Sequence, residues 1–270
     1  FAKAKAEKRE DQLIKSIIFK ARLSAQFEDN DPADYIKLFE KEKEDIHSPA
    51  ARAIYASLIG ELYQHYGMRN IGRFSNRTDE FKTSDQAIEN LSLEALQRRS
   101  IAYYIESLAY NGKEAFGDYE HLLSFDPEKT HLIKASNIRE FILFRALAHF
   151  MNDQSFITQV HDGFNINQPD FLLPQSEFIE IQLEHNEHSD YRQIAIELFQ
   201  RALKMSEGDK ALNVVIDLKR LQYAYNQLQG SEKDSLYLNA LDKLIEDNKD
   251  EPNSLYAYMK LIEYHQAYSE

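Results

Sequence analysis

The sequence predicts an all-α protein, built as a tetratricopeptide-like α-solenoid, that is, an array of helical hairpins. Three observations support this fold class. Glycine and proline, the residues that interrupt helices, number only 8 and 6 in 270 residues. Apolar side chains recur every three or four residues in the long segments, and no stretch of strand length alternates with a period of two. The third observation is an internal repeat.

The repeat covers two helix pairs between Tyr191 and Tyr268. Its members are related by an offset of 43 residues, most clearly in the second helix of each pair. A repeated helix pair of about this length is typical of α-solenoids, an architecture that does not specify an activity. The matched positions are Leu212/Leu255, Val215/Tyr258, Leu218/Leu261, Leu221/Tyr264 and Tyr225/Tyr268 in the second helices, and Ala195/Leu238, Leu198/Leu241 and Ala202/Ile245 in the first.

Composition disfavours several classes of protein. The net charge of −13 is the wrong sign for binding a phosphate backbone or an anionic lipid surface. Because cysteine is absent, the chain can form no disulfide, thiolate metal site or cysteine nucleophile. No signal peptide is present, and the longest apolar runs are far too short to cross a bilayer. The opening residues, FAKAKAEKRE, resemble the middle of a helix, so we expect the chain to be a fragment.

Helix starts and stops can be placed in the first part of the chain. We expect the first helix to run from the start to about Phe27. Asp31-Pro32 and Ser48-Pro49 each give an N-cap followed by proline, which opens the second and third helices. The third helix should end near Gly67.

The next predicted helix is long. Thr83 and Gln86 form a capping-box pair that would open it, and Asn111-Gly112 would stop it after Tyr110. A short helix is expected from Tyr119 to Phe125.

The helix from Ile138 to Met151, capped by Asn137, is apolar almost all round. Such a helix is usually covered on several sides. The segment DGFNINQPDFLLPQSEF that follows should cross the surface of the core. We therefore divide the chain into an N-terminal helical region, 1–175, and two helix pairs, 189–270, packed as one body.

The last helix, from Pro252 to Tyr268, carries two apolar faces. One consists of Leu255, Tyr258, Met259 and Ile262, and the other of Ala257, Leu261, Tyr264 and Tyr268. Only one face can pack on the preceding helix, whereas the final repeat of a solenoid normally shows a polar outer face. We expect the spare face to contact a following segment of the parent protein or another copy. The candidate contact residues are Tyr258, Leu261, Ile262 and Tyr264.

Arg69, Arg73 and Arg77 are spaced by four in a strongly acidic protein. If the helix continued through them, they would form one cationic face able to receive a carboxylate-rich partner. The alternative is that they pair with acidic side chains of the same chain.

Two patterns resemble ligand sites but lack the context that such sites need. Gly67 and Gly72 have the spacing of a phosphate loop, but a helix precedes them and Arg73-Phe74 follows, so a helix end and turn is expected. His185 and His188 lie among acidic residues without an identifiable third ligand. We therefore expect a hydrated loop there, and no metal or other cofactor.

Catalytic motifs are also missing from the sequence. Arg145 and His149 lie four apart on the most apolar helix, where a buried charge needs a partner, either Glu140 or a carboxylate of another helix. We expect this pair to be structural and the chain to have no catalytic residue and no enzymatic activity. A helical hydrolase or metal enzyme has no motif in its favour.

Several stretches, taken in order, resemble the N-terminal helical region of alpha-2-macroglobulin-like proteins from Bacteroidetes-type bacteria. They are FAKAKAEKREDQLIKSIIFKARL, GELYQHYGMRNIGRFSNRT, REFILFRALAHF, YRQIAIELFQRAL and DLKRLQYAYNQLQGSEKDSLYLNALDKLI. Together they span nearly the whole chain.

The resemblance implies an exported protein of the periplasm or outer-membrane-associated envelope. In the family, macroglobulin β-domains follow this region, and the full protein entraps or senses proteases. The family's reactive thioester needs a cysteine, so this segment cannot carry it. The expected function is a non-enzymatic scaffold whose partners are other domains of the same full-length chain, another protein, or a second copy. The alternative is a free-standing adaptor that binds peptides or proteins.

Overall fold

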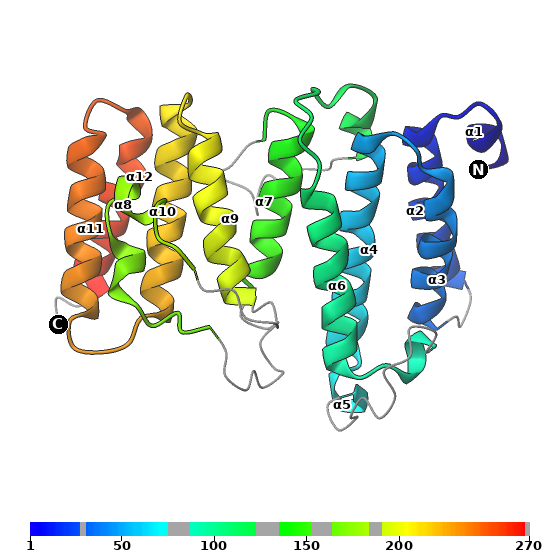
Figure 1. Ribbon diagram of the computed structural model, residues 1–270, viewed down its shortest axis with the longest axis horizontal. Helices are drawn as coiled ribbons and strands as arrows, with labels where there is room; N and C mark the ends of the chain where they lie inside the picture. Colours follow the sequence, from blue (N-terminus) through cyan, green and yellow to red (C-terminus); the bar gives the residue numbers. More distant parts are fainter. Residues whose placement is uncertain (28–30, 75–86, 123–134, 153–163, 184–190, 268–270) are drawn as a thin grey trace. The chain divides into compact units, whose positions relative to one another are not determined.

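The computed structural model describes residues 1–27, 31–74, 87–122, 135–152, 164–183 and 191–267. These residues form helices and connecting turns, with no strand among them (Figure 1). The all-α fold class is therefore confirmed. The chain divides into two compact units, the first comprising Phe1–Thr130 and Lys134–His149, the second His131–Ile133 and Phe150–Glu270.

The first unit contains the helices of the N-terminal half. Two of the predicted starts are confirmed, because Asp31 accepts a hydrogen bond from Ala33 N and Ser48 Oγ accepts one from Ala51 N. The helices are α1 (Ala2–Ala6), α2 (Glu10–Phe27), α3 (Pro32–Glu42), α4 (Pro49–Arg69), α5 (Ile71–Phe74), α6 (Leu93–Leu108) and α7 (Ile138–Phe150), the last residue of which belongs to the second unit. Short 3₁₀ turns are η1 (Lys43–Asp45), η2 (Ile88–Asn90) and η3 (Gly117–Leu122).

Helices α4 and α6 pack most closely in this unit. They run antiparallel, since Gly60 of α4 faces Ser100 and Tyr104 of α6, while Gly67 faces Leu93 and Leu96. Ser100 Oγ donates a 2.7 Å hydrogen bond to the Gly60 carbonyl. A Cβ atom on Gly60 would lie 2.8 Å from the Tyr104 ring, so the crossing depends on glycine.

The N-terminal helix is not continuous, contrary to the sequence prediction. Lys8 has a φ of +53°, and the chain turns between α1 and α2. The carboxylate of Glu10 then accepts hydrogen bonds from the backbone N–H groups of His47 and Ser48. This anchors the start of α2 to the start of α4, which a helix running straight from residue 1 would not provide.

The long helix predicted from Thr83 also starts elsewhere. Thr83 and Gln86 lie outside the described residues, but η2 and an extended Leu91 show that residues 88–91 are not part of it. The N-cap is Ser92, whose Oγ accepts a hydrogen bond from Ala95 N. The predicted helix is therefore wrong for residues 87–92, and its predicted start at Thr83 lies outside the described residues.

The helices predicted in the middle of the chain agree better with the structure than those predicted before them. Asn137 caps α7 by accepting from Glu140 N, and only Ala148 of that helix is exposed. The predicted short helix at Tyr119 is the 3₁₀ turn η3, described as far as Leu122.

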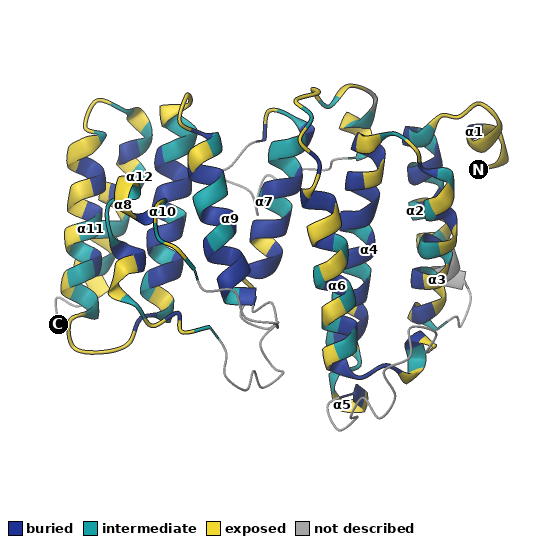
Figure 2. Cartoon of the chain, in the orientation of Figure 1, coloured by how far each residue is buried: buried dark blue, intermediate teal, exposed yellow. Residues whose placement is uncertain are grey.

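The second unit contains a series of packed helices. Helix α9 packs on α10, α10 on α11, and α11 on α12, so that α10 has neighbours on two sides and is mostly buried (Figure 2). The helices are α8 (Gln175–Phe178), α9 (Tyr191–Met205), α10 (Lys210–Gln227), α11 (Lys233–Asp247) and α12 (Leu255–Ala267), with 3₁₀ turns η5 (Pro169–Leu172) and η6 (Pro252–Ser254).

The η5–α8 segment, residues 169–179, belongs to this second unit. Phe171 and Phe178 are fully buried, and Gln200 of α9 donates to the carbonyls of Phe178 and Ile181. The segment is therefore built into the core and does not simply cross its surface. The chain passes from the first unit to the second between His149 and Phe150, and the division into 1–175 and 189–270 stays a prediction.

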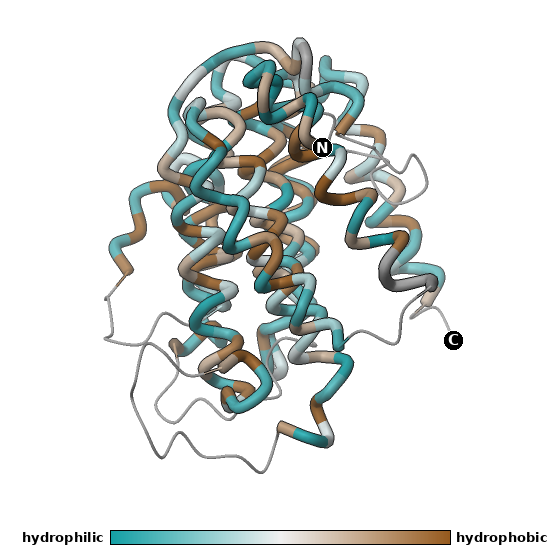
Figure 3. The backbone as a smooth tube through the Cα atoms, turned by 90° about the vertical axis from the view of Figure 1, so that its right-hand side faces the viewer, coloured by the Kyte–Doolittle hydropathy of each residue, from teal (hydrophilic) through white to brown (hydrophobic). Residues whose placement is uncertain are grey.

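No helix in the described part of the chain combines the length and the apolar character needed to cross a membrane. Hydrophobic and hydrophilic stretches alternate along the helices (Figure 3). This is the pattern of helices that bury one side on a neighbour.

Candidate functional site

A groove of about 600 Å³ lies between the η5–α8 segment, α10 and α11 of the second unit. Its size is within the range of sites that bind ligands. Apolar and polar side chains line it in about equal numbers. The apolar lining includes Leu172, Leu173, Ile179, Leu221, Leu236 and Leu244.

The floor of the groove contains a buried ion pair. Arg220 is 1 % exposed, and its Nε donates a 2.6 Å hydrogen bond to Oδ1 of Asp217, which is 4 % exposed. Arg220 Nη1 donates to the carbonyls of Phe171 and Leu173 at 2.8 and 2.9 Å. The guanidinium also lies over the Phe178 ring, 4.4 Å from its centroid. These contacts attach the η5–α8 segment to α10.

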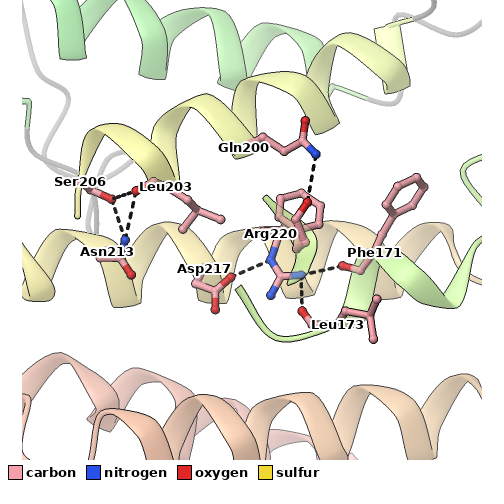
Figure 4. A network of polar contacts seen from close by, with 9 residues as sticks. Phe171, Leu173, Gln200, Leu203, Ser206, Asn213, Asp217 and Arg220 are labelled. Carbon is pink, nitrogen blue, oxygen red and sulfur yellow. Dashed lines mark hydrogen bonds and ion pairs between the residues drawn. The ribbon is translucent and has the colours of Figure 1, made fainter. Parts of the chain in front are cut away.

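Each member of the ion pair has one polar side-chain atom that makes no hydrogen bond to a described residue. Among the residues that the structure describes, no hydrogen bond uses Asp217 Oδ2 or Arg220 Nη2. Figure 4 shows both atoms pointing away from α9. Since both residues line the groove, a ligand there would meet one acceptor and one donor held side by side.

The rim on α11 is polar and exposed. Lys243 Nζ donates to Asp247 at 2.8 Å, and this bond to a carboxylate raises the pKa of the lysine. Asn239 lies one turn before Lys243 and also lines the groove. The α11 side of the groove therefore offers amide and charged groups.

A second candidate surface is the outer row of α12. Leu255, Tyr258, Met259 and Ile262 are exposed, while Ala257 is fully buried. Leu261 and Tyr264, the other two predicted contact residues, are half-buried. The structure thus separates the two predicted faces of this helix and leaves the first of them open.

The predicted arginine face does not form as one continuous helix. Helix α4 ends at Arg69, and Asn70 Nδ2 donates back to the Tyr66 carbonyl before α5 begins. Arg69 and Arg73 are exposed on separate helices, and Arg77 lies outside the described residues. Gly67 is buried inside α4, which excludes a phosphate loop at that glycine.

Arg145 and His149 have structural partners in the first unit. Arg145 forms an ion pair with Glu61 of α4, which confirms a carboxylate from another helix; the alternative, Glu140, instead accepts from Ser136 N and the Asn137 side chain. His149 Nδ1 lies 2.7 Å from Gln64 Oε1.

Ser100, His149 and Gln64 have the connectivity of a nucleophile, a base and an orienting group. Ser100 Oγ lies 3.4 Å from His149 Nε2. However, the hydroxyl is fully buried and donates to the Gly60 carbonyl, so it offers a substrate no access. We interpret the three side chains as a buried network that joins α4, α6 and α7.

Metal binding has little support in the described residues, which contain no group of three metal-ligating side chains. His185 and His188 lie outside those residues. Their predicted lack of a metal therefore stays a prediction.

Comparisons with protein-family models, curated proteins and solved structures found no match for this chain. The resemblance to macroglobulin-like proteins therefore stays a prediction from sequence.

Sequence reasoning did not single out Asp217 and Arg220. An Asp and an Arg three residues apart on a helix usually form a solvated surface pair. The available signal was their place beside Leu218 and Leu221, two positions of the repeat that are buried in α10.

Proposed function

We propose that this chain is a non-enzymatic helical scaffold that binds protein through the outer row of α12. The observation that carries the proposal is the exposure of four large apolar side chains on one helix face, with exposed fractions of 60, 44, 47 and 54 % for Leu255, Tyr258, Met259 and Ile262. Grouped apolar side chains of this kind mark contact sites.

The internal repeat supports a tetratricopeptide-like array. Val215 of α10 and Tyr258 of α12 are equivalent in the 43-residue repeat, yet Val215 is 2 % exposed and Tyr258 is 44 % exposed. The two positions differ because α10 has packed helices on two sides. A further helix or hairpin laid on α12 would cover Tyr258 as Val215 is covered.

The additional helices would come from the full-length protein or from another molecule. By its sequence resemblance, we place the chain in the N-terminal arm of a bacterial alpha-2-macroglobulin-like envelope protein. Its partner would then be another domain of the same chain. Protease entrapment would be a function of the full-length protein and not of this segment alone. A free-standing peptide- or protein-binding adaptor is the second candidate, favoured by the groove beside α10.

The test is sedimentation of the purified chain over a range of concentrations. We expect self-association, because the four side chains of the row on α12 stay exposed among the described residues. Replacing Leu255 and Ile262 with Glu should weaken that association about tenfold or more, since each change places a charge in an apolar contact. The control is Gln266→Glu, which adds one such charge at another exposed position of α12, outside the apolar row.

Two results would contradict this function. One is a wild-type chain that stays monomeric at every concentration and does not bind a longer form of the parent protein. The other is association that Gln266→Glu weakens as much as the double substitution does.

A further inference from the structure

We propose that the groove between the η5–α8 segment, α10 and α11 binds an extended peptide segment, whose main chain is recognised by Asp217 and Arg220. The site is separate from the outer row of α12. It rests on two charged side chains, both more than nine-tenths buried, that line the groove and that each keep one polar atom without a hydrogen bond to a described residue.

The two unshared atoms belong to side chains that are otherwise buried and bonded, and both residues line the groove, so a ligand there can reach them. Arg220 Nε donates to Asp217, and Nη1 donates to two backbone carbonyls. Nη2 makes no hydrogen bond to a described residue. Asp217 likewise uses one oxygen of two. A bound group that supplied both an acceptor and a donor would complete the pair.

The opposite charges of Asp217 and Arg220 determine which chemical group of a ligand can bind to both of them. A carboxylate would be attracted by Arg220 but would meet Asp217, and an ammonium group would meet the reverse conflict. An amide is neutral and carries one acceptor and at least one donor, so it satisfies both atoms. In an extended chain, one residue presents its N–H and C=O on the same edge, as it does towards a neighbouring antiparallel strand. A peptide main chain therefore fits this donor–acceptor pair.

The site is organised before a ligand arrives. The guanidinium is held by two carbonyls of the η5–α8 segment and stacks on Phe178, while Asp217 is held by Arg220. Fixing these groups in advance lowers the entropy cost of binding. Leu173, Ile179 and Leu236 line the same groove and would contact apolar side chains of the peptide.

The first experiment selects binders and locates them. A phage-displayed library of short random peptides is selected on the folded 270-residue protein, and the recovered peptides are resynthesised with blocked ends for fluorescence anisotropy. Ala240→Trp fills the groove from α11 and should weaken their binding about tenfold or more. Asp242→Trp is the matched control, because it adds the same indole at an exposed position of α11 that does not line the groove.

The second experiment tests the main-chain contact. Asp217→Asn keeps the shape of the side chain but places an NH₂ group where the free oxygen faces the peptide, so affinity should fall about tenfold. Methylating the contacting amide nitrogen of the peptide should cost a similar factor with the wild-type protein and little more with Asp217→Asn. Such non-additivity identifies the two groups as direct partners.

Three outcomes would overturn the proposal. The first would be a library that yields no peptide whose binding is weakened by Ala240→Trp. The second would be binding that Asp242→Trp weakens as much as Ala240→Trp does. The third would be binding that no backbone methylation weakens but that is abolished when a Gln or Asn of the peptide is replaced. The last result would mean that a side-chain amide, and not the main chain, occupies the pair. If the Asp217→Asn protein does not fold, the comparison of Ala240→Trp with Asp242→Trp and the methylated peptides on the wild-type protein still test the proposal.

Discussion

His149 is a buried imidazole that its surroundings keep neutral. It stacks on Tyr104 with ring centroids 4.0 Å apart and lies 2.7 Å from Gln64 Oε1. Its pKa is lowered from 6.5 to about 3, chiefly by burial and also by the positive charge of Arg145 and by the neighbouring His65. Protonating this ring therefore requires the first unit to open.

This residue predicts a specific acid sensitivity. As the pH falls below about 6.5, the unfolded chain binds a proton at His149 that the folded chain does not, so folding stability falls with pH. Between pH 7 and pH 5 the loss from this one group should be about 2 kcal/mol. Denaturant unfolding at the two pH values should show a loss smaller by that amount in His149→Gln, which cannot titrate. Equal losses in both proteins would mean that His149 is protonated in the folded state.

The buried charges differ in how far the sequence could reveal them. Arg145 lies on a helix that is apolar almost all round, so its need for a carboxylate from another helix was predictable, although Glu61 was not. Asp217 and Arg220 lie on a helix with a polar side, and their burial comes from Phe171 and Phe178. Those two aromatic residues precede them by some forty residues in the sequence and are placed by tertiary packing.

At the scale of the elements, helix starts with strong local chemistry were predictable and the others were not. Asp31-Pro32 and Ser48-Pro49 combine a side-chain cap with a proline, and both starts are confirmed. Ser92 has no proline after it, and the sequence analysis placed the start at the capping pair of Thr83 and Gln86 instead. The break at Lys8 involves neither glycine nor proline, and it is fixed by the contact of Glu10 with the start of α4.

The α4–α6 crossing gives a prediction at this scale. In Gly60→Ala the new methyl group would meet the Tyr104 ring and, 3.1 Å away, the Ser100 carbonyl. Overpacking of this kind costs about 1–3 kcal/mol, which outweighs the gain of about 1 kcal/mol in helix propensity. Thermal unfolding should therefore show a lower midpoint for Gly60→Ala.

The matched control lies one helix later. Gly72 is exposed in α5, and a Cβ atom there would have no neighbour within 4 Å. Gly72→Ala should therefore leave stability unchanged or raise it slightly. A Gly60→Ala protein as stable as the wild type would show that α4 and α6 can separate at little cost.

At the scale of the whole molecule, each unit has its own buried polar anchor. The first has the Ser100–His149–Gln64 network between α4, α6 and α7, and the second has Arg220, which joins α10 to the η5–α8 segment. Neither anchor depends on a side chain from the other unit. We therefore expect a substitution in the anchor of one unit to destabilise that unit more than the other.

Hydrogen exchange of the full chain with Arg220→Met provides the test. This change leaves Asp217 buried without its partner, and breaking a buried pair in this way costs about 3–5 kcal/mol. Amide protection should fall throughout α9, α10 and α11, while α4 and α6 should exchange as in the wild type, because local stability follows cooperative units. Gly60→Ala should produce the opposite pattern in the same experiment. If either substitution lowers protection equally in both units, the chain unfolds as one cooperative body, and the division at His149 and Phe150 has no energetic meaning.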